Sequence, residues 1–179
     1  MHYITDYLSP VGLLRLASKG ESLEGLWIDG QKYFCAGLAG ETVRDDSLNI
    51  FKNTKDWLER YFSGQRPAVS ELMLEPPGGQ FRQSVWNILC RIPYGHVMTY
   101  GDIAREIAEK TGRSSMSGQA VGGAVSHNPI SIIIPCHRVV GTNGSLTGYA
   151  GGIAVKIKLL ELEGVDMEHL FIPKKGTAL

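Results

Sequence analysis

The chain has 179 residues, 43% of them hydrophobic and 20% charged, and its formal net charge at pH 7 is zero. This composition is that of a globular protein with a sizeable core, and the net charge alone indicates neither a nucleic acid nor a membrane as partner. No apolar run approaches the ~20 residues of a membrane span, and the first residues lack the pattern of a signal peptide.

The N-terminal half has the pattern of a small antiparallel sheet followed by a helix. Four segments separated by turn residues are expected to be strands: 2–8, 13–18, 22–29 and 31–38. Apolar residues at helical spacing predict a helix over 47–62, which Gly64 ends. Residues 63–80 are rich in Pro and Gly and are expected to link an N-terminal α/β domain, 1–75, to a C-terminal domain, 76–179.

The C-terminal half begins with helices. Apolar spacing predicts a helix over 81–89, and Thr99 with Asp102 forms a capping box that starts the next one. A loop is expected over 111–118, and a helix of small residues over 119–127. Ser115 or Ser117 can serve as the N-cap of this helix.

This last helix contains two adjacent glycines, Gly122 and Gly123. Each weakens a helix by about 1 kcal/mol relative to alanine, and the usual reason is close approach of another backbone or a ligand. Two short helices of this kind are typical of a helix-turn-helix. Tight packing in a helical core is the alternative that the glycines leave open.

The charge pattern of this half also points to a polyanion. No acidic residue occurs between positions 110 and 160, where five basic residues do: Lys110, Arg113, Arg138, Lys156 and Lys158. Such a stretch lets a polyanion approach without repulsion. Chance in a region rich in Gly and Ser is the alternative.

Three cysteines, Cys35, Cys90 and Cys136, are an odd and sparse set. This argues against a disulfide framework, and we expect an intracellular, cytoplasmic protein (nuclear in a eukaryote). No Cys-x-x-Cys or His-x-x-x-His spacing occurs, so we expect no structural zinc site.

The stretch "SIIIPCHRVVG", residues 131–141, places a thiol next to an imidazole. Ile132–Ile134 predicts a buried strand, which Pro135 ends because proline cannot donate to a sheet ladder. We expect this to lift Cys136 and His137 out of the core, where a histidine can depress the pKa of the thiol. A small buried hydrophobe is the alternative for Cys136.

Neighbouring motifs favour a reactive site. Tyr149 in "TGYAGG" predicts a pocket wall, and "LLELEG" offers Glu161 or Glu163 as the carboxylate that orients an imidazole. Asn128, before a proline, is a turn residue by default, and its amide could equally anchor a loop or bind the edge of a ligand.

Residues 81–164 resemble the O6-alkylguanine-DNA alkyltransferases. The resemblance rests on "FRQSVWNILCRIPYGHVMTYGDIA", "AVGGAVSHNPISIIIPCHRVVG", "TGYAGG" and "LLELEG". It implies an α/β (α+β) fold: a small N-terminal antiparallel sheet domain with a helix, then a helical domain with a winged helix-turn-helix-like DNA-binding motif and an active-site strand. The N-terminal half matches the family only in size, order and the "SPVG" turn.

The resemblance implies a role for each site residue. Cys136 would accept the alkyl group, His137 would act as base through a water, Glu163 would orient His137, and Asn128 would support the active-site turn. Tyr100 would press on the phosphate 3′ to the target, and the guanine pocket would be lined by Tyr100, Val139, Tyr149 and Ala150. The implied DNA contacts are Thr99, Tyr100, Arg113, Gln119, Ala120, Gly123 and Ser126.

The implied activity is direct reversal of O6-alkylguanine damage in double-stranded DNA, bound through the minor groove, with one alkyl group transferred per molecule. O4-alkylthymine is a further candidate substrate. We expect a monomer that needs no cofactor, metal or membrane. The rivals are a non-catalytic module that binds alkylated DNA, an alkylation-sensing regulator and an unrelated thiol hydrolase.

The sequence departs from the family at the position before "AVG". Family members usually carry an arginine there, which fills the gap left by the flipped base, and this chain has Gln119. Glutamine is shorter and uncharged, and it cannot stack as a guanidinium does. Arg113, in the unusually long loop between the two helices, could supply the missing charge.

Overall fold

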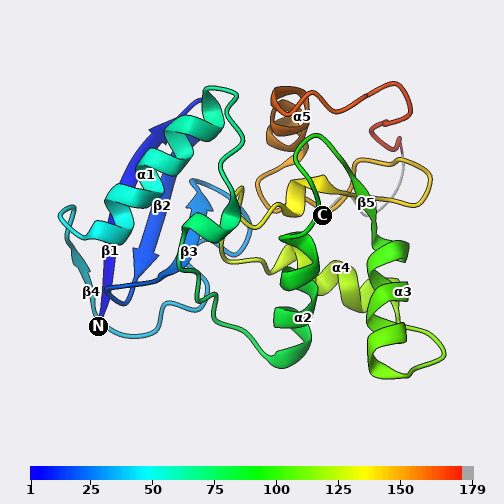
Figure 1. Cartoon of the computed structure of the whole chain (residues 1–179), viewed down its shortest axis with the longest axis horizontal. Helices are drawn as coiled ribbons and strands as arrows, with labels where there is room; N and C mark the ends of the chain where they lie inside the picture. The colour runs from blue at the N-terminus through cyan, green and yellow to red at the C-terminus, as the bar shows by residue number, and fades with distance from the viewer. Residues whose placement is uncertain (175–179) are drawn as a thin grey trace. The chain divides into compact units, whose positions relative to one another are not determined.

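The computed structural model describes residues 1–174 (Figure 1). The chain divides into two compact units. The first comprises residues 1–77 and 129–133, and the second comprises residues 78–128 and the chain from 134 onward. The expected C-terminal domain extends to residue 179, and residues 175–179 lie outside the described range.

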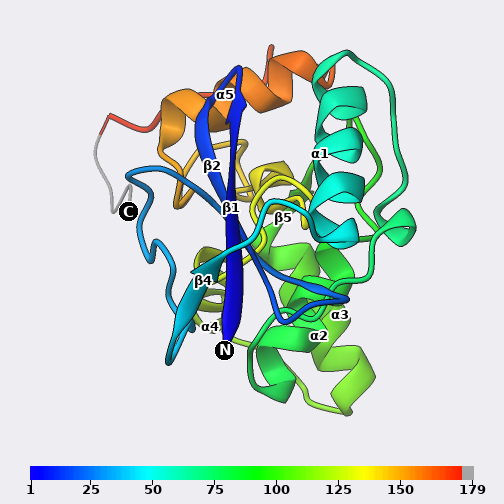
Figure 2. The same ribbon diagram turned by 90° about the vertical axis from the view of Figure 1, so that its left-hand side faces the viewer.

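A four-stranded sheet forms the first unit, in the order β3-β2-β1-β4. Strands β1 (His2–Ser9), β2 (Gly12–Ser18) and β3 (Leu23–Ile28) are antiparallel, whereas β4 (Thr42–Arg44) pairs parallel with β1. Helix α1 (Asn49–Phe62) packs on β1 and β2, as Figure 2 shows, and a short 3-10 turn, η1 (Val69–Glu71), follows. The expected sheet with one helix is therefore confirmed.

The segment 31–38 is not a strand, so that part of the prediction was wrong. It forms turns in which Tyr33 and Cys35 take φ values of 59° and 55°. Its apolar side chain Phe34 instead packs on Trp27, with ring centroids 6.5 Å apart. At the β3 edge, the returning residues 129–131 bond to Leu26, whose N–H donates to Pro129 O at 2.8 Å. These residues, and not 31–38, therefore lie beside β3.

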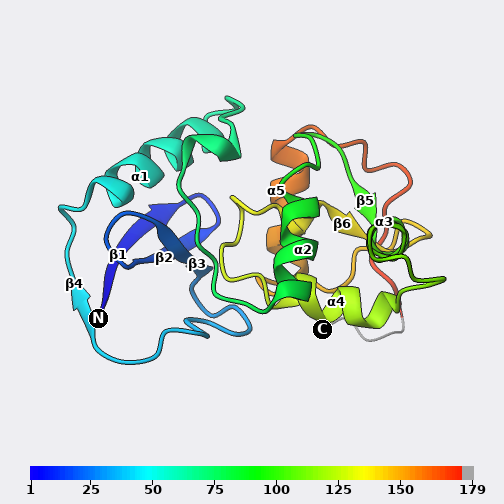
Figure 3. The same cartoon turned by 60° about the horizontal axis from the view of Figure 1, so that its bottom comes forward.

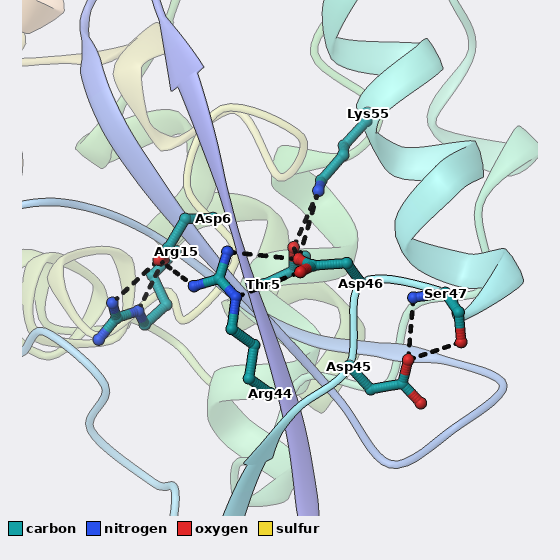
Figure 4. Close-up of polar contacts among 8 residues, drawn as sticks. All are labelled: Thr5, Asp6, Arg15, Arg44, Asp45, Asp46, Ser47 and Lys55. Carbon is teal, nitrogen blue, oxygen red and sulfur yellow. Dashed lines mark hydrogen bonds and ion pairs between the residues drawn. The ribbon is translucent and has the colours of Figure 1, made fainter.

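A network of charged side chains ties β1, β2, β4 and α1 together (Figure 4). Asp6 accepts hydrogen bonds from Arg15 Nε at 2.9 Å and Arg44 Nη1 at 2.9 Å. Arg44 also binds Asp46, and Lys55 of α1 lies 3.9 Å from the same carboxylate. Hydrogen bonding to Arg15, with a further contribution from Arg44, lowers the pKa of Asp6. The network holds the short strand β4 against the sheet.

The second unit is mainly helical. Its helices are α2 (Gln80–Leu89), α3 (Tyr100–Thr111), α4 (Gly118–Ser126) and α5 (Ile153–Leu162). Both α2 and α3 pack against α4, as Figure 3 shows, and Trp86 Nε1 donates to Ala124 O at 2.9 Å. A 3-10 turn, η2 (Cys136–Arg138), leads into β6 (Val139–Val140), which pairs parallel with β5 (Met98–Thr99).

The helix starts follow the sequence signals. Thr99 Oγ1 accepts from Asp102 N at 3.0 Å, and Thr99 N donates to Asp102 Oδ2 at 3.2 Å, which confirms the capping box of α3. Of the two serines considered for α4, Ser117 is the cap, because its Oγ accepts from Ala120 N at 3.3 Å. Gly112 ends α3 in the left-handed conformation, with φ of 65°.

The expected strand over Ile132–Ile134 is absent, so that prediction was wrong. Ser131–Ile133 form a turn, in which Ile132 takes φ of 71° and Ile133 N donates to Ser131 O at 2.8 Å. The three isoleucines are nonetheless buried. Burial alone selects large apolar residues here, so a β-branched run does not by itself indicate a sheet.

Candidate active site

Cys136 opens the turn η2, directly after Pro135. The expectation that proline lifts this residue out of the core was wrong: Cys136 is only 4% exposed and His137 is fully buried. Asn128 Nδ2 donates to Cys136 Sγ at 3.1 Å and to Ile134 O at 2.8 Å. Burial raises the pKa of the thiol, while the hydrogen bond from Asn128 acts to lower it.

His137 faces a carboxylate. Its Nε2 lies 2.6 Å from Glu163 Oε1, and both side chains are fully buried. Burial lowers the pKa of His137, and Glu163 opposes this shift. Nδ1 is also buried and has no hydrogen-bond partner among the described residues. The sequence left Glu161 and Glu163 as alternatives, and the structure brings only Glu163 to the imidazole, since Glu161 is exposed.

Arg138 binds the other side of the same carboxylate. Its Nε donates to Glu163 Oε2 at 2.8 Å, and its Nη2 donates to Oε1 at 3.0 Å. Its Nη1 donates to Ile92 O at 2.6 Å. Burial alone would raise the pKa of Glu163, but His137 and Arg138 outweigh it and hold the pKa at about 2. Glu163 is therefore ionised at neutral pH.

Lys156 of α5 is fully buried near this cluster. Its Nζ donates to Val139 O and, at 3.0 Å, to Thr147 O. Burial lowers its pKa to about 8, and the charge of Cys136 opposes this shift. Sequence reasoning counted Lys156 only as part of a basic stretch. Its spacing from Leu159, Leu160 and Glu163 was the signal, because these positions share one helix face.

Two tyrosines contribute to the same site. Tyr100 donates its hydroxyl to Thr147 O at 3.2 Å, and burial raises the pKa of Tyr100 to about 12. Tyr149 lies edge-on to His137, with ring centroids 6.4 Å apart, and its buried hydroxyl has no partner among the described residues. Burial raises the pKa of Tyr149 as well, and an ionised Cys136 would raise the pKa of both tyrosines further.

The remaining pocket residues flank this centre. Val139 follows η2 directly and is fully buried, and Ala150 is half-buried next to Tyr149. Val139 therefore adjoins the thiol turn in the chain and Tyr149 lies beside His137. That Tyr100, Val139, Tyr149 and Ala150 line a guanine pocket stays a prediction.

The residues expected to contact DNA lie at the end of β5, on α3 and α4, and in the loop between these two helices. Arg113, Gln119 and Ala120 are exposed, whereas Thr99, Gly123 and Ser126 are half-buried. Ser126 Oγ donates to Gly123 O at 3.0 Å.

The two central glycines of α4 differ in their surroundings. A Cβ added to Gly123 would meet no atom within 4 Å, whereas one added to Gly122 would lie 4.0 Å from Tyr100 Cε1. Internal packing therefore does not require glycine at position 123.

Neither a metal site nor a membrane span is found in residues 1–174. This range contains no group of three or more His, Cys, Asp or Glu side chains that could hold a metal ion. None of its helices is long and apolar enough to cross a membrane. All three cysteines are free.

A helix-turn-helix beside a buried thiol that adjoins a histidine–carboxylate pair defines a class of protein, one that brings thiol chemistry to a nucleic acid. Sequence comparison specifies the class further. Residues 80–165 match the 6-O-methylguanine DNA methyltransferase, DNA binding domain, and residues 2–76 match the ribonuclease-like domain of the same family. The chain belongs to the 6-O-methylguanine DNA methyltransferase family.

Individual relatives agree with this assignment. The methylated-DNA–protein-cysteine methyltransferase of Haemophilus influenzae is 40% identical over 163 residues, which is 91% of this chain and 87% of the relative. The protein of that name from Mycobacterium tuberculosis is 41% identical over 163 residues, 91% of this chain and 92% of the relative. A structure of Mycobacterium tuberculosis OGT in complex with DNA matches with a TM-score of 0.79 and 39% identity, covering 90% of this chain and 93% of that one.

Proposed function

We propose that this protein repairs DNA by direct reversal, moving the alkyl group from O6 of guanine to Sγ of its own Cys136. The observation that carries the proposal is the thiol held 3.1 Å from Asn128 Nδ2, next in the chain to a histidine whose buried Nδ1 is unpartnered among the described residues. A purely structural cysteine needs neither group. The family relationship supports the same activity.

The chemistry balances within the site. His137 accepts the thiol proton at Nδ1, through a bridging water, and the imidazolium is stabilised by Glu163. The thiolate sulfur attacks the alkyl carbon, the carbon–O6 bond breaks, and guanine leaves as its anion with the bonding electrons. The anion becomes guanine by taking a proton at N1, which balances the proton that His137 took from the thiol and returns to solvent. The product is a thioether on Cys136, which no group in the site can cleave. Each molecule therefore acts once and needs no cofactor or metal.

The substrate in this proposal is O6-alkylguanine in double-stranded DNA, with O4-alkylthymine as a further candidate. A stacked base is out of reach of a buried thiol, so the nucleotide is flipped out at a cost of a few kcal/mol. Tyr100, Val139, Tyr149 and Ala150 would line its pocket. The open side of α4 at Gly123 suits the minor groove, which is only about 6 Å wide. The protein would act as an intracellular monomer.

Intact-mass measurement after incubation with free O6-benzylguanine tests this function. We expect one benzyl group per molecule, mapped to Cys136, and none on the Cys136→Ala variant. Cys90→Ala, which removes a different partly buried thiol, serves as the matched control and should react like the wild type. No adduct would favour a non-catalytic binding module, and an adduct on Cys35 or Cys90 would refute the assignment of the nucleophile.

A DNA-dependent assay addresses a second rival, an alkylation-sensing regulator. Repair predicts that O6-methylguanine in duplex DNA is restored to guanine in step with methylation of Cys136. A regulator that reacts with free alkylating agents but leaves the lesion in DNA intact would show the second event without the first.

A further inference from the structure

We infer that Arg138 is a positioning residue for this reaction: by binding both carboxylate oxygens of Glu163, it keeps His137 neutral with Nδ1 free to accept a proton. The inference deepens the proposed function and rests on it. It assigns a role to the residue that follows His137 in the chain.

The carboxylate of Glu163 accepts at least four hydrogen bonds. Oε1 accepts from His137 Nε2 at 2.6 Å and from Arg138 Nη2 at 3.0 Å. Oε2 accepts from Arg138 Nε at 2.8 Å and from Gly95 N at 3.2 Å. All of these donors address an ionised carboxylate, since a proton on either oxygen would displace one of them.

This arrangement fixes the tautomer of His137. An ionised carboxylate can only accept, so Nε2 of His137 must carry the proton that is shared with Oε1. A neutral imidazole has only one such proton, which leaves a lone pair on Nδ1. Nδ1 is therefore set as the base, and it is the atom without a described partner.

The surrounding charges oppose a second proton on His137. The turn η2 contributes Cys136 and Arg138, and α5 contributes Lys156, with Glu163 directly after its last residue. The loop between β6 and α5 contributes Tyr149. Two of these groups are cations, and both lower the pKa of His137, in the same direction as burial. Glu163 alone acts the other way. A histidine–glutamate pair without Arg138 would hold the imidazolium more strongly, and a protonated histidine cannot accept the thiol proton.

The contacts of the guanidinium also explain why this residue is arginine. Its fork binds two oxygens of Glu163 at once, and Nη1 donates to Ile92 O at 2.6 Å. Its Cζ lies 5.8 Å from the ring centroid of Tyr94. Its charge also acts to lower the pKa of Cys90, which burial raises. A lysine ammonium is a point charge that cannot hold both oxygens in one plane. Charge and geometry can therefore be separated by substitution.

The test is the pH dependence of benzyl transfer to Cys136 from free O6-benzylguanine, which requires no DNA binding. Arg138→Met should move the acid-side inflection of the rate upward by about one pH unit, the size of shift expected for loss of a neighbouring like charge. Arg138→Lys keeps the charge and should keep the inflection near that of the wild type, with a lower rate. Arg91→Met removes an exposed arginine at the end of α2 and should change neither quantity.

A uniform loss of rate in Arg138→Met with an unchanged inflection would overturn the inference, because a merely structural role predicts that result. NMR of ¹⁵N-labelled histidine in the wild-type protein gives a reading that does not depend on any variant folding. We expect His137 to be the Nε2–H tautomer and neutral at pH 6.5, the ordinary pKa of histidine. A cationic His137 at neutral pH would refute the inference even if Cys136 transfers alkyl groups, and absence of transfer alone would refute only the function.

Discussion

Lys156 is a buried cation whose hydrogen bonds go to two carbonyl oxygens, Val139 O and Thr147 O. Removing an ammonium from water costs several kcal/mol unless a nearby charge compensates it. The charge of the Cys136 thiolate provides this compensation, because it raises the pKa of Lys156. Lys156 therefore stabilises the thiolate at the expense of the resting, protonated state.

We predict that Lys156→Met slows alkyl transfer at least tenfold, because one pKa unit on the thiol corresponds to about that factor in the thiolate fraction. The methionine is close in volume, so the fold should be retained. The rate of Cys136 modification by iodoacetamide as a function of pH measures the shift directly. Lys158→Met, on the exposed side of the same helix, is the matched control, and an equal effect of both variants would contradict the prediction.

The sequence predicts the reactive side chains of the site better than the buried basic residues that surround them. Adjacency in the chain brings out Cys136 and His137, and the resemblance selects Glu163 from two carboxylates. Arg138 and Lys156 escape such reasoning because long basic side chains are usually solvated. Arg138 is buried where it donates to Ile92 O, and Lys156 is buried where it donates to Thr147 O. Neither tertiary contact can be read from the residues next to it in the sequence.

Among the elements, the pair α3 and α4 with the loop between them carries the departure from the family. Gln119 stands one residue before the small side chains of α4, and Arg113 lies in the loop; both are exposed. Either can therefore reach a bound duplex without rearrangement of the core.

We predict that Gln119→Arg accelerates repair of O6-methylguanine in duplex DNA, with no change toward free O6-benzylguanine, which needs no flipping. A guanidinium adds positive charge near the phosphates and can stack on the bases that flank the gap. The gain should be smaller for an unpaired lesion, which costs less to open. If Arg113 already fills the gap, Gln119→Arg will have no effect and Arg113→Ala will show the duplex-specific loss.

A second prediction for α4 separates folding from DNA binding. Gly123→Ala should raise the free energy of unfolding by roughly 0.5–1 kcal/mol, because alanine is the better helix former and its Cβ meets no atom within 4 Å. The same methyl group should weaken binding to duplex DNA by obstructing the minor groove. Thermal unfolding and DNA affinity measure the two effects, and transfer from free O6-benzylguanine should be unchanged. Unaltered DNA affinity would remove α4 from the proposed interface.

The elements also show what local pattern can predict. Thr99 and Ser117 start helices because capping is a matter of a few neighbouring residues. The strands predicted over 31–38 and 132–134 rest on apolar and β-branched content, which indicates burial rather than backbone geometry. The left-handed conformation of Ile132 is not visible in the sequence, since only glycine and asparagine signal it locally.

Lowering the pH should reduce the free energy of unfolding of this protein. Glu163 has its pKa lowered from 4.5 to about 2, and His137 has its pKa lowered from 6.5. A group with a depressed folded-state pKa stabilises the fold above its unfolded value and loses that contribution as the pH falls. The pKa of Asp6 is also lowered, so its network weakens in acid too.

We therefore predict that the melting temperature of the wild type falls progressively as the pH is lowered from about 6.5 to about 3. Glu163→Gln should be less stable than the wild type at pH 7, since it leaves the buried Arg138 without its carboxylate. The difference should narrow as the pH falls from about 4.5 toward about 2, because the carboxyl of Glu163 takes up a proton first in the unfolded chain and in the folded protein only near pH 2. Thermal unfolding across this range provides the measurement, and parallel curves for the two proteins would disprove the account.

The two-residue pairing of β5 with β6 has a consequence for engineering. Met98 pairs with Val139 and Thr99 with Val140. Thr99 is the N-cap of α3, and Val139 directly follows the turn η2, so this short pairing joins the start of α3 to the end of the turn. A chimera that takes α3 and α4 from one relative and the turn η2 from another must preserve the pairing of β5 with β6. The strands β5 and β6 should therefore come from the same relative, and residues 129–133, which belong to the first unit and bond to Leu26, must in addition match β3.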